Sequence, residues 1–383
     1  MTPYYPLPFH FVTGVFFIFG SMVGSFLNVC IHRMPRGESV VRPRSRCPHC
    51  GYSIPWALNV PLVTWLFLRG RCRSCQEPIA ARYFLVELLT AMMFAVCWIR
   101  FGSVSIGLPV VMALLIAAFI VATFIDLEHY IIPDEITLGG VIAGLFFSFW
   151  VPAMHQAETA AEAMKRSFLG AAVGAGVVYA MLRLGKLLFG RQRITLPAAS
   201  KLVFTETELV LPDQRVPFED IFYRKSDTVV LRAAKLDLPD RCYRDVEVRL
   251  SPERLRIGEE ELLPESVPHM EAETTQLVLP REAMGLGDVK FMGAIGAFLG
   301  WQATLFSLMF SALFGSLVGV TAIVCGRRDW SSRIPYGPYI AAAAVAWIFL
   351  PVRFQGHWND YLDIVAYVMR QLFWPGSLPG GRG

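Results

Sequence analysis

Long apolar runs, separated by short polar segments, dominate the pattern of this chain. There are eight, and the shortest begin at 84, 136 and 291: Phe9–Ile31, Phe84–Ile99, Val104–Ile125, Ile136–Val151, Phe168–Leu188, Phe291–Gly300, Ala303–Cys325 and Ile334–Val352. A membrane-spanning helix needs about 20 apolar residues. Phe291–Gly326 has no charged residue and is too long for one span, so we predict a turn near Gly300-Trp301-Gln302. The pattern predicts about eight transmembrane helices.

Composition agrees with this pattern. Hydrophobic residues make up 54% of the 383 residues and charged residues only 17%, whereas a soluble domain has about 25% charged residues. The first run lacks the basic start and the cleavage site of a signal peptide. We therefore expect a polytopic α-helical membrane protein whose first transmembrane helix lies in residues 1–31.

The arginines predict an orientation. Segment His32–Tyr83 contains nine arginines and two glutamates, and three more arginines follow the seventh run. Positive loops face the cytoplasm, so this segment is expected there and both termini outside. The net charge of +4 is then a topology signal rather than a sign of nucleic-acid binding, because no pattern of stacking aromatic residues accompanies it.

Residues 190–282 differ from the rest of the chain. They hold 18 of the 31 acidic and 14 of the 35 basic residues, and their apolar and polar positions alternate as in β-strands. We predict an inserted, β-rich soluble domain facing the cytoplasm. Five positions also repeat at an offset of 46, which suggests two related hairpin units: Leu209, Leu211, Val216, Glu219 and Ile221 match Leu255, Ile257, Leu262, Glu265 and Val267. This domain shows no catalytic constellation and is interpreted as a regulatory or docking insert.

Four cysteines form two C-x2-C pairs separated by 21 residues: Cys47 and Cys50, then Cys72 and Cys75. This spacing is typical of a structural, tetrahedral zinc site. Two disulfides are the alternative, which a reducing cytoplasm disfavours. The other four cysteines are interpreted as packing residues: Cys30, Cys97, Cys242 and Cys325.

Two aspartates stand at the ends of apolar runs. Asp126 ends the third run and Asp288 opens the sixth, and since these runs cross in opposite directions, both carboxylates are expected at the cytoplasmic face. Two carboxylates held close share a proton, so one can activate water while the other hydrogen-bonds a scissile carbonyl. Gly285 and Gly287 would allow close approach to Asp288.

Other interpretations of these acids stay open. Asp126 alone is compatible with an interfacial anchor, and Asp288 with a simple ion pair to Lys290. A further interpretation is that Asp134 caps the helix that begins near Ile136. The nearby acids also suit a cation site: Asp126, Glu128, Asp134 and Glu135.

Five segments together resemble the type IV prepilin peptidases, GxGD-type aspartyl proteases of the bacterial inner membrane. They are "GSFLNVCIHRMP", "CPHC…CRSC" followed by "RYFLVELLTA", "IDLEHYIIPDEIT", "MGLGDVKFMGAIGAFLGW" and "IPYGPYIAAA". The resemblance covers nearly everything except 190–282. Two departures are Phe84, where the family commonly has proline, and the insert, which separates the two aspartates by 162 residues.

The resemblance implies a function. Family members remove the basic leader of prepilins and pseudopilins at the cytoplasmic side, after a glycine, and many then methylate the new N-terminus with S-adenosylmethionine. It implies Asp126 and Asp288 as the catalytic pair, Gly285, Gly287 and Lys290 as motif support, and the four cysteines as zinc ligands. S-adenosylmethionine is expected on family grounds alone, and no residue is assigned to it.

The expected organisation follows. It comprises a first transmembrane helix (1–31), a four-cysteine zinc domain (32–83), helices two to five (84–189), the insert (190–282), helices six to eight (283–352) and a C-terminal tail (353–383). The insert is a candidate docking surface for other pilus or secretion components. The alternatives are a peptidase without methyltransferase activity, a non-catalytic assembly factor of a pilus or secretion system, and a transporter, to which only Glu87 lends support.

Overall fold

The chain divides into two compact units in its computed structural model, and each is described by itself: Met1–Val178 with Leu286–Gly383, and Tyr179–Gly285. The described residues are 8–47, 49–55, 60–189, 191–211, 215–218, 221–222, 227–280, 285–325 and 335–373.

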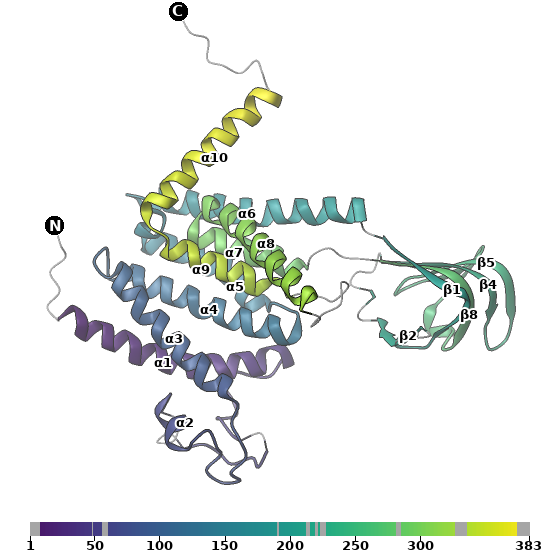
Figure 1. The fold of residues 1–383 in the computed structure, drawn as a ribbon, viewed down its shortest axis with the longest axis horizontal. Coiled ribbons are helices and arrows are strands. Elements are labelled where there is room, and N and C mark those ends of the chain that lie inside the picture. Colours follow the sequence, from purple (N-terminus) through teal and green to yellow (C-terminus); the bar gives the residue numbers. More distant parts are fainter. Residues whose placement is uncertain are drawn as a thin grey trace, which may run out of the picture. The chain divides into compact units, whose positions relative to one another are not determined.

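The first unit is built of helices (Figure 1). They are α1 (Phe9–Arg33), α2 (Val63–Phe67), α3 (Ala81–Phe101), α4 (Gly107–His129), α5 (Asp134–Trp150), α6 (Ala160–Phe189), α7 (Leu286–Leu299), α8 (Trp301–Val324), α9 (Gly337–Phe349) and α10 (Val352–Phe373). Each of the eight predicted apolar runs overlaps one of the longer helices. The helical fold class is therefore confirmed.

The number of spans is smaller than the number of apolar runs. Among the described residues, α1, α3, α4, α6 and α8 are long and apolar enough to cross a membrane, and a sixth candidate is α9 with α10, which meet at a bend of 113°. Helices α5 and α7 have 17 and 14 residues. At 1.5 Å per residue, neither reaches across a hydrocarbon core of about 30 Å. The structure thus supports five to six candidate spans rather than eight.

Two local features bear on the predictions for the C-terminal half. Helix α7 ends at Leu299 and α8 begins at Trp301, with Gly300 between them at φ +83°, so the turn predicted here is confirmed. The segment interpreted as a tail is helical as far as Phe373. Helix α10 is held to α8 by Trp358, whose Nε1–H donates to the carbonyl of Gln302 at 3.1 Å.

Paired glycines let the helices touch backbone to backbone. On α6, a Cβ at Gly170 would lie 2.1 Å from the carbonyl oxygen of Gly296 on α7, and one at Gly174 would lie 2.3 Å from that of Met292. Glycines four residues apart allow such contacts between membrane helices. Two further pairs make close contacts of this kind, against α3 and α7: Gly20 with Gly24 on α1, and Gly140 with Gly144 on α5.

This packing predicts that Gly170→Ala lowers stability by about 1–3 kcal/mol, since the added methyl group overpacks the contact. The matched control is Gly176→Ala on the same helix, where a Cβ would meet no described atom within 4 Å. Thermal unfolding of the detergent-solubilised protein measures both. Equal unfolding temperatures for the two variants would contradict the α6–α7 contact.

The second unit contains an eight-stranded antiparallel sheet, so the prediction of a β-rich insert is confirmed. Its strands are β1 (Arg191–Phe204), β2 (Glu208–Val210), β3 (Arg215–Pro217), β4 (Val229–Asp237), β5 (Cys242–Leu250), β6 (Leu255–Ile257), β7 (Glu260–Leu262) and β8 (Met270–Pro280). Their order is β3-β2-β1-β8-β4-β5-β6-β7. The last turns of α6 belong to this unit, where Lys186 pairs with the buried Asp227 at 3.0 Å.

Two hairpins of the sheet have equivalent residue pairs. Leu209 pairs with Val216 in the β2–β3 hairpin, and Leu255 pairs with Leu262 in the β6–β7 hairpin. These are four of the positions that match at an offset of 46; Glu219 lies outside the described residues. The strand order is symmetric: if β1, β2, β3 and β4 exchange labels with β5, β6, β7 and β8, the result is the same order read from the other end. Each set of four strands therefore places its fourth strand beside the first strand of the other set.

Candidate active site and metal centre

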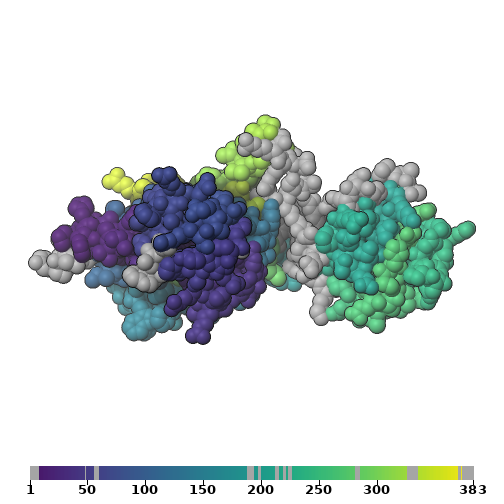
Figure 2. Space-filling model, turned by 90° about the horizontal axis from the view of Figure 1, so that it is seen from below, coloured from purple at the N-terminus to yellow at the C-terminus, as the bar shows by residue number. Residues whose placement is uncertain are grey.

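The four predicted cysteine ligands come together. Their sulfurs all lie within 4.8 Å of one another, and the described residues contain no other group of this size suited to a metal. The two knuckles fold alike: the N–H groups of Cys47 and Cys72 donate to the carbonyls of Tyr52 and Glu77, both at 2.9 Å. In Figure 2 their segment forms a compact lobe, coloured purple to dark blue, on the face toward the viewer.

The sulfur geometry fits a divalent metal. Cys47 Sγ lies 3.8 Å from Cys75 Sγ, and Cys50 Sγ lies 4.0 Å from Cys72 Sγ. A disulfide requires about 2.05 Å, whereas a tetrahedral zinc with bonds of about 2.3 Å separates its sulfurs by about 3.8 Å. This cluster can hold a metal such as zinc.

The remaining cysteines divide into two kinds. Cys30 and Cys97 are buried, whereas Cys242 and Cys325 are exposed. The interpretation as packing residues is therefore wrong for the last two. An alternating strand such as β5 sends every second residue to solvent, and Cys325 caps the end of α8.

Asp126 lies in the last turn of α4, with 6% of its surface exposed. Its Oδ2 accepts the N–H of Gly337, the first residue of α9, at 2.8 Å. The N-terminus of a helix carries partial positive charge, so α9 is oriented to hold this carboxylate. A Cβ at Gly337 would itself lie 2.8 Å from the same oxygen, so glycine is needed for this approach.

Asp288 lies in the first turn of α7 and is half-buried. Ile132 lies between the first turn of α7 and the first turn of α9. Its side chain lies 3.6 Å from a Cβ built at Gly287 and 3.1 Å from one built at Gly337.

Two of the other acids near Asp126 form ion pairs, Asp134 and Glu128. Lys290 on α7 binds Asp134 at 2.7 Å, and Glu128 pairs with Arg82. The expected cap is wrong, because α5 begins at Asp134 itself and its N-cap is Pro133 with no side-chain hydrogen bond. Of the predicted motif residues, Lys290 therefore links α7 to α5, and Gly285 immediately precedes α7.

The residues that the sequence analysis missed are Ile132 and Gly337. Their signal was present in the segments "YIIPDE" and "IPYGPY". A glycine before a proline at the start of a helix marks a place where backbone must approach another group closely.

Comparison with known proteins decides the family. Residues 18–101 match the Bacterial Peptidase A24 N-terminal domain, and residues 113–196 and 272–320 match the Type IV leader peptidase family. A prepilin leader peptidase/N-methyltransferase of Dichelobacter nodosus is 35% identical over 213 residues, which cover 47% of this chain and 69% of the relative. The chain belongs to the type IV leader peptidase family. The N-terminal match contains the four cysteines, and the family match contains both Asp126 and Asp288.

Two further relatives carry the same printed name. The protein of Aeromonas hydrophila is 29% identical over 359 residues, which cover 87% of this chain and 88% of the relative. That of Myxococcus xanthus is 44% identical over 158 residues, which cover 41% of this chain and 44% of the relative. No solved structure matches the chain. The family match leaves out 197–271, which lie in the sheet unit.

Proposed function

We propose that this chain is a membrane aspartyl endopeptidase that removes the basic leader of type IV prepilins or pseudopilins. One observation carries the proposal: Asp126 accepts the N–H of Gly337, and Ile132 lies beside both Gly337 and Gly287, so the segments that carry Asp126 and Asp288, more than 150 residues apart in sequence, meet around one side chain. Two carboxylates held close together share a proton, which the proposed mechanism uses. Membership of the leader peptidase family supports the choice of substrate.

Asp126 and Asp288 are the proposed catalytic pair. The ionised carboxylate removes a proton from a water molecule, and the water oxygen attacks the scissile carbonyl carbon. The protonated partner donates a hydrogen bond to the carbonyl oxygen. When the C–N bond breaks, the leaving amine takes a proton from the pair. The N–H of Gly337 holds one oxygen of Asp126 in a fixed position throughout.

The proposed location is the bacterial inner membrane, crossed by the five to six candidate spans, with the four-cysteine lobe and the sheet unit in the cytoplasm. The support is the nine arginines of His32–Tyr83, since basic loops are retained inside. A basic leader reaches the catalytic pair from the same side. On this proposal the four cysteines hold a structural zinc ion, because four thiolates leave no open position for substrate.

The proposed second activity is N-methylation of the new N-terminus with S-adenosylmethionine. Its support is the name of the relatives, which are called leader peptidase/N-methyltransferase. The sheet unit, which the family match leaves out, is proposed as a docking surface for other pilus or secretion components.

The test of the proposed function is cleavage of a prepilin by the purified, detergent-solubilised chain, followed by mass spectrometry of the product. We expect a mature pilin that begins directly after the leader glycine. A folded, zinc-loaded protein that leaves the leader attached would overturn the proposal and favour a non-catalytic assembly factor.

Gly337→Ala is expected to slow leader cleavage by about 10- to 100-fold, because a methyl group 2.8 Å from Asp126 Oδ2 displaces the carboxylate and misplacement by about 1 Å has a cost of this order. Initial rates of cleavage measure the effect. Gly139→Ala is the control, since a Cβ there meets no described atom within 4 Å. Equal rates for the two variants would show that Gly337 does not position the carboxylate.

A further inference from the structure

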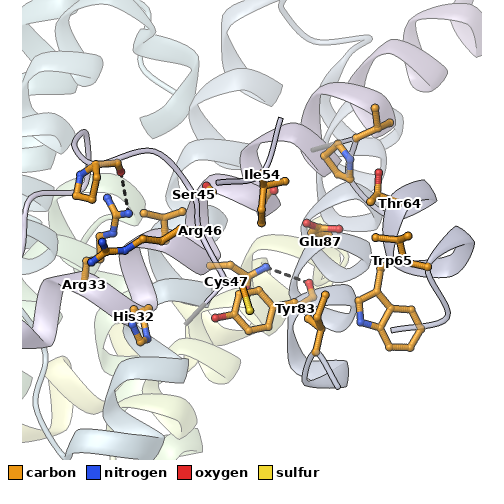
Figure 3. A pocket seen from close by; sticks show the side chains of 18 of the residues that line it. His32, Arg33, Ser45, Arg46, Cys47, Ile54, Thr64, Trp65, Tyr83 and Glu87 are labelled. Carbon is orange, nitrogen blue, oxygen red and sulfur yellow. Dashed lines mark hydrogen bonds between the residues drawn. The ribbon is translucent and has the colours of Figure 1, made fainter. Parts of the chain in front are cut away.

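A cavity of about 550 Å³ lies among α1, α3 and the four-cysteine lobe, and the catalytic aspartates do not line it. Sites for small molecules have volumes of about 300–1,000 Å³. Figure 3 shows Glu87 and Trp65 on one side of it, Tyr83 in the middle, and His32, Arg33 and Arg46 on the other side. The cavity thus has an acidic and aromatic side and a basic side.

Two buried polar atoms in its wall have no protein partner among the described residues: Asn28 Oδ1 and Trp65 Nε1. Asn28 is only 1% exposed, and its Nδ2 is already used in a hydrogen bond to the carbonyl of Tyr83 at 3.0 Å. Most buried polar groups are paired, and an unpaired one is costly. One unpaired acceptor and one unpaired donor in the same cavity wall indicate a polar ligand.

A buried carboxylate holds a strained turn in the same wall. Leu62 has φ +63° and ψ −54°, and the N–H of Val63 donates to the carbonyl of Pro61 at 2.6 Å, which makes a tight three-residue turn. The N–H of Leu62 donates to Glu87 Oε2 at 2.7 Å. Strained backbone of this kind is concentrated at binding sites. Glu87, 9% exposed, also has a hydrogen bond with Ser25, and both residues line the cavity.

The aromatic and basic groups are also fixed in place. The Trp65 ring packs on Phe84 at 5.1 Å between centroids, so Phe84, in the first turn of α3, contacts the lobe. Arg33 donates to the carbonyls of Ser39 and Pro43, both at 2.9 Å, and thereby shapes the loop. Arg46 also lines the cavity and is exposed. Its guanidinium group is the second one in the wall, beside that of Arg33.

We propose that this cavity binds the adenosyl methyl donor of the methyltransferase activity, an inference that rests on the proposed function. A carboxylate is a suitable acceptor for ribose hydroxyl groups, which assigns the ribose to Glu87. Tyr83 and Trp65 provide an aromatic surface for the adenine, while Trp65 Nε1 and Asn28 Oδ1 supply a donor and an acceptor. Arg46 pairs with the carboxylate of the amino-acid end.

Binding of S-adenosylhomocysteine to the full-length, zinc-loaded protein, measured by calorimetry, tests this site. Glu87→Gln keeps an acceptor for Leu62 but removes the charge, and we expect affinity to fall about tenfold. Trp65→Phe removes only the ring N–H and the second ring, and we expect a fall of about three- to tenfold. The control Trp301→Phe changes a tryptophan that does not line the cavity and is expected to bind as the wild type does.

A second measurement does not depend on how the variants fold. Ultraviolet crosslinking of radiolabelled S-adenosylmethionine to the wild type, followed by peptide mapping, is expected to label peptides within 25–87. Label confined to other peptides would overturn the proposal, as would unchanged affinity in both cavity variants or a wild type that binds no S-adenosylhomocysteine. Leader cleavage by the wild type without cofactor, run in parallel, judges the peptidase proposal separately.

Discussion

Asp126→Asn and Asp288→Asn are each expected to reduce leader cleavage by about a thousandfold or more. An amide neither accepts a proton from water nor donates an acidic one, and proton transfer by a positioned side chain contributes about 10²–10⁴-fold. On the proposed mechanism the two carboxylates act as a unit, so the double variant is expected to be little worse than either single one. Initial rates on a prepilin substrate, with product masses, measure all three variants.

The substitution at Asp126 is conservative for the fold, because an asparagine oxygen still accepts the N–H of Gly337. Unfolding temperatures within a few degrees of the wild type would establish this. Asp134→Asn is the matched control: it also removes a carboxylate next to α4, but one that is exposed and paired with Lys290. An exposed ion pair contributes about 0–1 kcal/mol, so cleavage is expected to stay within a few fold. Full activity of a folded Asp288→Asn would end the paired-aspartate mechanism.

Much of the helical unit could be predicted, since uncharged runs of about 20 residues have few alternatives to a helix. Their lengths limited the prediction of spans: the apolar run around α7 gives a helix of only 14 residues, too short to cross alone. The tail was missed as a helix because α10 is amphipathic and carries charges such as Asp360 and Asp363. A scan for uncharged runs does not find such a helix.

The candidate site was predictable in its charged residues and not in its neighbours. Asp126 and Asp288 stand out because a carboxylate is costly at the edge of a membrane. Asp126 accepts the N–H of Gly337, 211 residues away in sequence. This hydrogen bond depends on how α4 and α9 pack. Sequence alone contains only the hint of a glycine followed by proline. Asp134 does not cap α5 because the helix begins at Asp134 itself, and its ion pair with Lys290, distant in sequence, depends on how α5 and α7 pack.

The cavity was still harder to predict from the sequence than the candidate active site. Asn28, Trp65 and Glu87 come from α1, the lobe and α3, and no spacing rule connects them. Glu87 attracted attention as an acid in an apolar run, yet its partner proved to be the backbone of Leu62. The glycines Gly20 and Gly24, which bring α1 against α3, are a readable signal that a search for chemistry overlooks.

Cys72→Ser, or removal of the metal with a chelator, is expected to unfold the four-cysteine lobe. Structural zinc contributes about 10–16 kcal/mol in small zinc-binding peptides, and the lobe has little else: α2 is its one α-helix among the described residues, and most of its residues are exposed. Limited trypsin digestion measures the effect, since nine arginines in His32–Tyr83 become accessible when the lobe opens. Zinc content is expected to fall from one ion per chain to none.

The control for this change is Cys242→Ser, which removes an exposed thiol in the sheet unit and should alter neither zinc content nor digestion. Cys47 lines the cavity beside α1 and α3, so loss of zinc is expected to abolish binding of S-adenosylhomocysteine as well. An unchanged digestion pattern after complete removal of zinc would show that the lobe folds without metal. The four sulfurs would then have to be assigned a role other than structural support.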